Sequence, residues 1–139
     1  MIDTLNYTML ETNILEGSGA TVTGTLLDDN DDPLILSAGS VNSLSGMSLT
    51  LYSFSDSETL TIINNRDAQD VLNQNNVTID VLGNFTWYIQ PGDTKIVDNT
   101  NREEIHRAVF TWTYGNYTLY RVGKKIIDFR VYNLDKIVT

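Results

Sequence analysis

The stretch Ile105–Tyr114 reads Ile-His-Arg-Ala-Val-Phe-Thr-Trp-Thr-Tyr, and it decides the fold. Successive side chains of a β-strand point to opposite faces, so residues two apart share a face. The stretch therefore predicts one long strand with two distinct faces. We expect Phe110 and Trp112 on its buried face, and Val131 in the strand that closes the fold. One face would carry His106, Ala108, Phe110, Trp112 and Tyr114, opposite Ile105, Arg107, Val109, Thr111 and Thr113.

The same alternation of period two continues on both sides of this stretch, from about residue 20 onwards. Clusters of Asp, Asn, Gly and Pro separate the segments and indicate turns. The predicted count is about seven to nine short strands, which is typical of an antiparallel β-sandwich or a small barrel. The stretch 67–72 is either a single helical turn or an irregular connection. Strands are expected near 21–27, 47–54, 60–63, 77–81, 85–89, 117–122 and 127–131, with turns at 28–33, 55–58, 115–116 and 123–124.

Residues 1–19 fit the alternation least well, and Glu16-Gly17-Ser18-Gly19 resembles a flexible joint. We therefore expect an N-terminal arm and joint over residues 1–19 and the sandwich over residues 20–139. Apolar side chains on a mobile arm are explained if a partner surface buries them. The predicted partner-binding residues are Ile2, Leu5, Tyr7, Met9, Leu10, Ile14 and Leu15.

The composition argues against several classes of function. Eighteen acidic and nine basic residues give a formal charge of -9, which repels nucleic-acid phosphates and anionic lipids. The absence of cysteine excludes disulfides and thiolate chemistry, and a single histidine leaves little material for a metal site. Because neither a signal peptide nor a long apolar run is present, we expect a soluble protein made in a cytoplasm. No nucleic acid, membrane or cofactor is expected.

Asp28, Asn30 and Asp32 match the first three ligand positions of an EF-hand-type calcium loop. The match then fails, because Pro33 takes the position that needs glycine and no glutamate follows at the required spacing. We therefore predict a solvated turn between two strands that does not need calcium.

Candidate catalytic residues are few. His106 is the only histidine, and it has no nucleophile motif beside it, so we expect it at the surface or half-buried. Glu103, Glu104 and Asp93 could form a glycosidase-like carboxylate pair, but a chain with eighteen acids always offers such pairs. Phosphate-binding motifs are missing. The sequence therefore predicts a protein that is not an enzyme.

Several aromatic residues could instead form a platform on which a sugar stacks. About half of them should simply fill the core, because they alternate along predicted strands. A glycan binder must expose two or more of them on one concave face. The candidates are Trp87, Tyr88, Phe110, Trp112, Tyr114, Tyr117 and Tyr120.

Three segments together resemble Ig-like domains of tailed-bacteriophage structural proteins. The stretch 83–94 reads Gly-Asn-Phe-Thr-Trp-Tyr-Ile-Gln-Pro-Gly-Asp-Thr and is similar to a strand followed by a "Pro-x-Asp-Thr" corner. It precedes a strand of the kind seen at 110–115, and the opening segment 23–34 and closing segment 123–131 fit the same pattern. The resemblance covers about residues 20 to 134. It implies an Ig-like β-sandwich without a catalytic site to transfer.

The resemblance implies a virion structural protein, such as a capsid decoration, neck or upper-baseplate subunit, made in the host cytoplasm and carried in the virion. Its partners would be coat, connector or tail subunits, and it could also form a homo-oligomer. The competing hypothesis is a carbohydrate-binding or adhesion module displayed on a tail or other surface.

Overall fold

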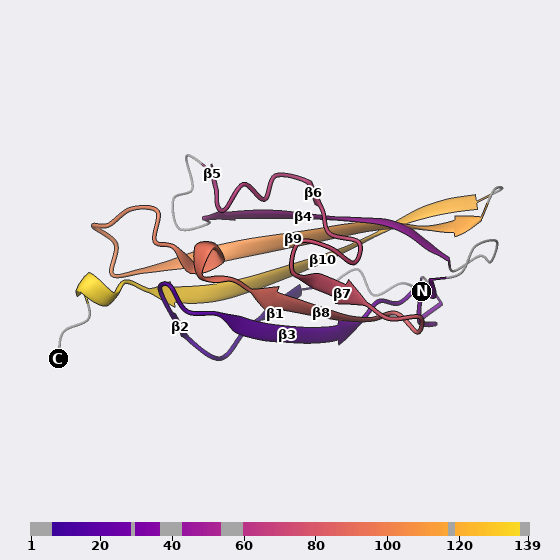
Figure 1. Cartoon of the computed structure of the whole chain (residues 1–139), viewed down its shortest axis with the longest axis horizontal. Coiled ribbons are helices and arrows are strands. Elements are labelled where there is room, and N and C mark those ends of the chain that lie inside the picture. Colours follow the sequence, from indigo (N-terminus) through magenta and orange to yellow (C-terminus); the bar gives the residue numbers. More distant parts are fainter. Residues whose placement is uncertain (1–6, 29, 37–42, 54–59, 117–118, 137–139) are drawn as a thin grey trace.

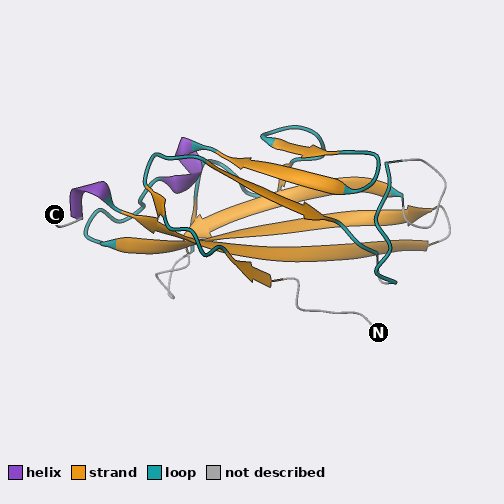
Figure 2. Cartoon of the chain, turned by 90° about the horizontal axis from the view of Figure 1, so that it is seen from below, coloured by secondary structure: helices purple, strands orange, loops and turns teal. Residues whose placement is uncertain are grey.

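The computed structural model describes residues 7–28, 30–36, 43–53, 60–116 and 119–136. These residues form two facing β-sheets, as the sequence predicted (Figure 1). Two short 3-10 helices, η1 (Pro91–Thr94) and η2 (Leu134–Lys136), follow strands (Figure 2). The larger sheet contains β1 (Tyr7–Met9), β2 (Ile14–Leu15), β4 (Leu44–Ser53), β5 (Thr61–Ile62), β6 (Gln69–Asp70), β9 (Glu103–Asn116) and β10 (Leu119–Tyr132). The smaller sheet contains β3 (Ala20–Thr25), β7 (Val77–Ile79) and β8 (Asn84–Ile89).

The strand order is that of an immunoglobulin-like sandwich. The larger sheet runs β1-β10-β9-β4-β5, with β2 also on β10 and β6 also on β4, and the smaller sheet runs β3-β8-β7. Read as strands B to G, β3, β8 and β7 form the BED sheet, while β10, β9 and β4 form the GFC sheet, which β5 extends. The predicted hairpin between β7 and β8 is confirmed, with Ile79 opposite Phe85.

The long strand predicted from the alternation is β9, and its predicted inner face is buried. Phe110 is fully buried and Trp112 is 4% exposed. The strand is fourteen residues long and pairs with β10 in one continuous register, from Asn116↔Leu119 to Glu103↔Tyr132. The alternation therefore fixed both the strand and the face that meets the core.

The turn predicted at 123–124 is wrong. Gly123 lies inside β10, directly opposite Trp112 on β9. A Cβ atom at position 123 would collide with Nε1 of the Trp112 indole. Glycine is needed here because the indole ring lies against the backbone, and not because the chain turns.

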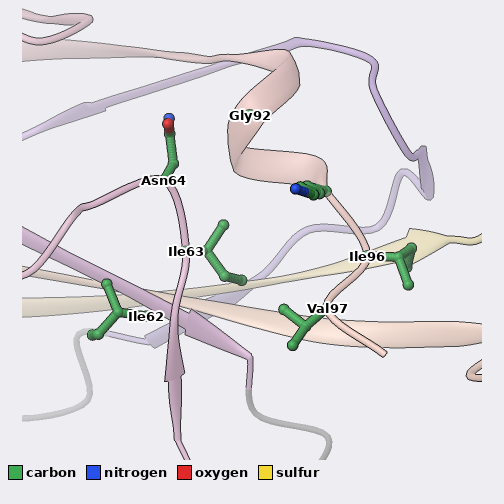
Figure 3. Close-up of a pocket in the computed structure, with 7 residues that line it drawn as sticks. Ile62, Ile63, Asn64, Gly92, Ile96 and Val97 are labelled. Carbon is green, nitrogen blue, oxygen red and sulfur yellow. The ribbon is translucent and has the colours of Figure 1, made fainter. Parts of the chain in front are cut away.

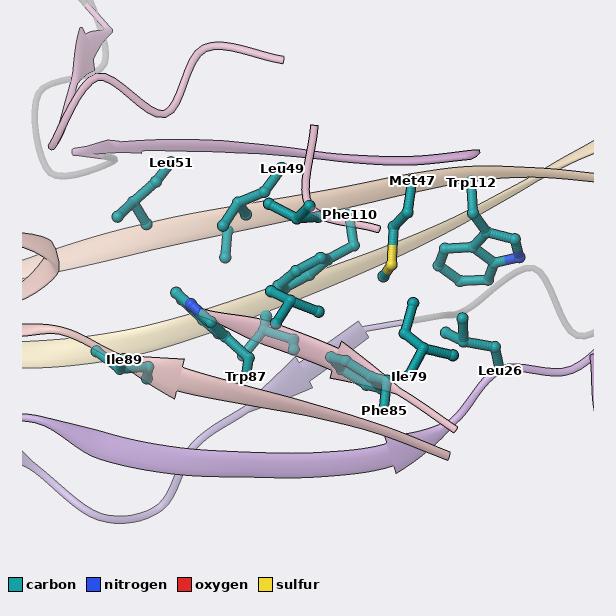
Figure 4. Close-up of a cluster of buried hydrophobic side chains, with 14 of the residues drawn as sticks. Leu26, Met47, Leu49, Leu51, Ile79, Phe85, Trp87, Ile89, Phe110 and Trp112 are labelled. Atoms are coloured by element: carbon teal, nitrogen blue, oxygen red, sulfur yellow. The ribbon is translucent and has the colours of Figure 1, made fainter. Parts of the chain in front are cut away.

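The core lies between the two sheets and is rich in aromatic rings (Figure 4). Phe110 makes edge-to-face contacts with Phe85 and Trp87 at centroid distances of 5.5 and 5.3 Å. Phe129 contacts Trp87 in the same way at 5.9 Å. Such contacts join the two sheets, since Phe85 and Trp87 come from β8. The burial predicted for Phe110, Trp112 and Val131 is confirmed.

The N-terminal segment departs from the predicted arm. β1 and β2 pair in parallel with β10, where Tyr7 lies opposite Ile126 and Ile14 opposite Val131. Over its described residues 7–19, the predicted arm therefore contributes two short strands to the edge of the larger sheet. Its two strands are three and two residues long, which is too short for a period-two pattern to become visible.

Two other local expectations are corrected. The stretch 67–72 contains the short strand β6, which pairs with β4. The strand predicted over 77–81 ends at Ile79, and Val81 is 66% exposed in the turn that follows. The Asp80 carboxylate forms that turn by accepting hydrogen bonds from the backbone N–H groups of Leu82 and Asn84 at 2.9 and 3.0 Å.

Candidate functional site

The predicted partner-binding residues do not form one surface in the described structure. Ile14 is buried in the core at 5% exposure, and Leu10 packs partly buried against it. Tyr7 and Leu15 are exposed at 46% and 43%. Met9 is half-buried. Ile2 and Leu5 lie outside the described residues.

Tyr7 is tied to the sheet by a charged cluster. Its hydroxyl donates to Asp128 Oδ2 at 2.8 Å, and Arg107 donates to the same carboxylate through Nε and Nη2 at 2.8 and 2.9 Å. The hydrogen bond to Asp128 raises the pKa of Tyr7, and the same carboxylate raises the pKa of Arg107. A bidentate Arg–carboxylate pair fixes the position of Asp128, so the cluster holds β1 beside β10 at the edge of the larger sheet.

A buried arginine organises the end of the sandwich that contains η1. Arg66 is 1% exposed and Asp93 is fully buried. Nε of Arg66 donates to Asp93 Oδ1 at 2.6 Å, and Nη2 donates to Oδ2 at 3.1 Å. The remaining guanidinium N–H groups donate to Gln69, Asn76 and the Asn75 carbonyl, so all five donors are used. The arginine thereby joins η1 to the loop over residues 64–76.

His106 is fully buried, which corrects the expected surface or half-buried position. Its Nδ1 lies 3.0 Å from the Asp93 carbonyl oxygen, and its Nε2 lies 3.0 Å from Glu104 Oε1. The ring therefore joins the Asp93 carbonyl to the Glu104 carboxylate and is held in one orientation between them.

Glu104 is fixed by four donors. Besides His106, these are the backbone N–H groups of Val97 and Asp98, at 2.9 and 2.8 Å, and the Asn101 side chain at 2.9 Å. Burial acts to raise the pKa of Glu104, but the hydrogen bonds, that from His106 foremost, outweigh it and lower this pKa from 4.5 to about 2. The carboxylate thus holds the loop over residues 97–101 against β9.

The carboxylates considered for a glycosidase-like pair have other partners. Asp93 and Glu104 are buried in the two hydrogen-bonded groups described above. Glu103 is 46% exposed in its side chain and pairs with Arg130 at 3.3 Å. Sequence reasoning missed the role of Arg66. One signal in the sequence could have indicated that Arg66 is buried: it follows the apolar pair Ile62-Ile63 after only two asparagines.

The acidic turn, residues 28–32, has the geometry of a solvated turn where it is described. Asp28 Oδ1 accepts from the N–H groups of Asn30 and Asp32 at 2.8 and 2.9 Å. Leu27 bridges Pro33 on the other side of the turn. The carboxylate that would begin a calcium loop is therefore bonded to the backbone. In the described part of the chain, no three His, Cys, Asp or Glu side chains gather as metal ligands.

Most candidate stacking aromatics are buried. Trp87, Phe110, Trp112 and Tyr114 are at most 4% exposed. Tyr88 and Tyr120 are 45% and 65% exposed, but Tyr88 lies on the smaller sheet and Tyr120 on the larger one. Tyr117 lies outside the described residues. Among the described candidates, no two exposed rings share a sheet as a sugar platform requires.

A shallow pocket of about 390 Å³ lies beside η1 (Figure 3). Apolar side chains of Ile62, Ile63, Ile96 and Val97 form much of its lining. Of its polar residues, Asn64 already donates to Asp93 at 2.8 Å. The pocket therefore offers a small hollow of mixed polar and apolar lining with one charged side chain, Lys95.

The far half of the β9–β10 hairpin is the most distinctive surface. It extends beyond the smaller sheet, at the opposite end of the molecule from η2 (Figure 1). On its β9 side the hairpin is covered by β4 as far as Tyr114. On its β10 side, the neighbouring strand is β1, whose first residue, Tyr7, lies opposite Ile126. Residues 119–125 therefore have no strand beside them among the described residues. We call residues 119–125 the open edge.

The middle of the hairpin, between Glu104 and Asp128, is opposite in charge to the chain as a whole. Residues 105–127 contain no Asp or Glu and carry Arg107, Arg121, Lys124 and Lys125. The whole chain has a formal charge of -9. The open edge is therefore a local positive surface on an acidic protein.

Comparison with protein-family models, with curated proteins and with solved structures found no match. In the described part of the chain, no helix is long and apolar enough to cross a membrane.

Proposed function

We propose that this chain is a non-catalytic binding module that serves as a structural subunit of a tailed-bacteriophage particle. The binding role is supported by one observation: the middle of the β9–β10 hairpin carries a net positive charge in an otherwise acidic chain, and residues 119–125 of β10 have no neighbouring strand among the described residues. Exposed strand edges are templates for pairing with another chain. The virion assignment is carried by the resemblance of segments 23–34, 83–94 and 123–131 to Ig-like phage domains.

The buried polar groups support a structural role. The guanidinium of Arg66, the imidazole of His106 and the carboxylate of Glu104 each hold a loop in place, and each is buried. Such satisfied networks make a domain rigid and specify its loops. A subunit at a fixed position in a particle needs this rigidity. Its partners would be coat, connector or tail subunits, or further copies of itself.

The test is the composition of purified particles. The chain should be found by mass spectrometry in virions of the phage that encodes it, at a constant ratio to the major coat protein. Removing the gene should give particles that lack the chain and are altered in assembly or stability. A chain that stays in the host-cell lysate while complete, stable particles form without it would contradict the proposal.

A further inference from the structure

We propose that a second copy of this chain docks on the outer face of the larger sheet, which is the face turned away from the smaller sheet (Figure 1). The inference deepens the proposed function, because it names the surface through which further copies of the subunit are joined. Three observations support it: the outer face is apolar at its centre, the outer face of the smaller sheet is polar, and the charges of the proposed surface nearly cancel.

The register of the three long strands defines the outer face. Leu49 on β4, Phe110 on β9 and Ile127 on β10 are fully buried in the core between the two sheets. Because side chains alternate along a strand, the residues next to these three point away from the smaller sheet. The outer face therefore carries the even-numbered residues 48–52 of β4, the odd-numbered residues 103–113 of β9 and the even-numbered residues 120–132 of β10.

The centre of the outer face is apolar. Val109 lies directly opposite Ile126 of β10 on one side and Thr50 of β4 on the other, and all three residues are half-buried. Tyr120 and Val122 continue this surface along β10, at 65% and 68% exposure. Aromatic and apolar residues gather in this way at the centre of protein interfaces, which are depleted in charged residues. The outer face thus has the composition of an interface.

The outer face of the smaller sheet has the opposite composition. Phe85 and Trp87 of β8 are buried in the core, so the residues between and beside them point outward. Apart from Tyr88, the outward residues of β3, β7 and β8 are Thr21, Thr23, Thr25, Thr78, Asn84 and Thr86. Such polar side chains suit a sheet face in contact with water. The two outer faces of the sandwich therefore differ, and only that of the larger sheet is suited to burial.

The charge of the outer face favours a second copy as the occupant. On β4, β9 and β10 this face carries three cations, Arg107, Lys124 and Arg130, and two carboxylates, a net charge of +1 in a chain of formal charge -9. Both carboxylates pair within the face, Asp128 with Arg107 at 2.8 Å and Glu103 with Arg130 at 3.3 Å. A two-fold dimer places the same patch on both sides, so the patch must not repel itself. A nearly neutral face meets this condition, whereas a highly charged partner such as nucleic acid needs a face of one sign.

The experiment measures self-association of the whole chain by sedimentation equilibrium. We expect a monomer–dimer equilibrium with a dissociation constant of about 100 μM or tighter. Added salt should tighten the dimer, because it screens the repulsion between two acidic chains. Val109→Glu places a carboxylate at the apolar centre and should weaken the dimer at least about tenfold. The matched control Thr86→Glu adds the same charge to the outer face of the smaller sheet, and should change the dissociation constant less than about threefold.

A second variant, Ile126→Thr, removes apolar surface without adding charge and should weaken the dimer at least about threefold. Circular dichroism shows whether each variant folds like the original chain. Three results would overturn the proposal. One is a chain that stays monomeric at about 500 μM in low and high salt, which would leave this face to a different protein. Another is a dimer that Thr86→Glu weakens as much as Val109→Glu, and the third is a dimer that salt dissociates. Each would leave the particle-composition test of the proposed function unaffected.

Discussion

The buried pair of Arg66 and Asp93 gives the sharpest test of how the loops are held. Replacing arginine with methionine keeps most of the side-chain volume and removes all five N–H donors. The Asp93 carboxylate would remain fully buried, and its remaining side-chain donors among the described residues would be the Asn64 amide and the Gln90 N–H. A buried charge deprived of its partner is costly, so the variant should be strongly destabilised.

The expected loss for Arg66→Met is ~3–5 kcal/mol, the usual cost of removing one partner of a buried ion pair. A domain of this size loses roughly 3 °C of melting temperature per kcal/mol, so the midpoint should fall by roughly 9–15 °C. The double variant Arg66→Met with Asp93→Leu removes the orphaned charge as well. It should recover a large part of the loss, because apolar groups of similar volume can replace such a pair.

Urea unfolding measures these free energies, with each midpoint interpreted at a constant denaturant slope. The matched control is Arg130→Met, which breaks the exposed pair with Glu103 and should cost only about 0–1 kcal/mol. If Arg66→Met cost as little as this control, or if adding Asp93→Leu made it worse, the argument that a desolvated charge dominates would be refuted.

Four further outcomes are expected. Because the pKa of Glu104 is lowered from 4.5 to about 2, its carboxylate stabilises the fold above pH 4.5, and this stabilisation is lost as the pH falls towards about 2. Unfolding free energy measured against pH should therefore fall less steeply over this range in Glu104→Gln than in the original chain. Gly123→Ala should cost ~1–3 kcal/mol by crowding Trp112, whereas Gly46→Ala, whose Cβ meets only a hydroxyl at 3.2 Å, should cost less in the same urea titration. Deleting residues 1–15 should lower the melting temperature measured by calorimetry, because Ile14 belongs to the core. An unchanged melting temperature would instead support the predicted mobile arm. Melting curves with calcium and with chelator should overlap, and a shift of several degrees with calcium would mean that the acidic turn binds it.

The sequence by itself determined the parts of the fold that depend on local alternation. The run 105–114 specified β9 and its buried face, including Phe110 and Trp112. The acidic turn and the hairpin before Ile89 followed from turn residues between alternating segments. These features are local because a strand's faces and a turn's hydrogen bonds are set by residues only a few positions apart.

Only the tertiary structure decided the rest. Arg66 meets Asp93 across 27 positions of the chain, and Tyr7 meets Asp128 across 121. No local pattern encodes such pairs, since they arise when the two sheets and their connecting loops bring distant segments together. Gly123 resembles a turn residue until the indole of Trp112 lies across it, which depends on the register of two strands. The open edge likewise depends on which strands lie beside β10 and where they end. The sequence shows the alternation within a strand, but it does not show which strands become neighbours.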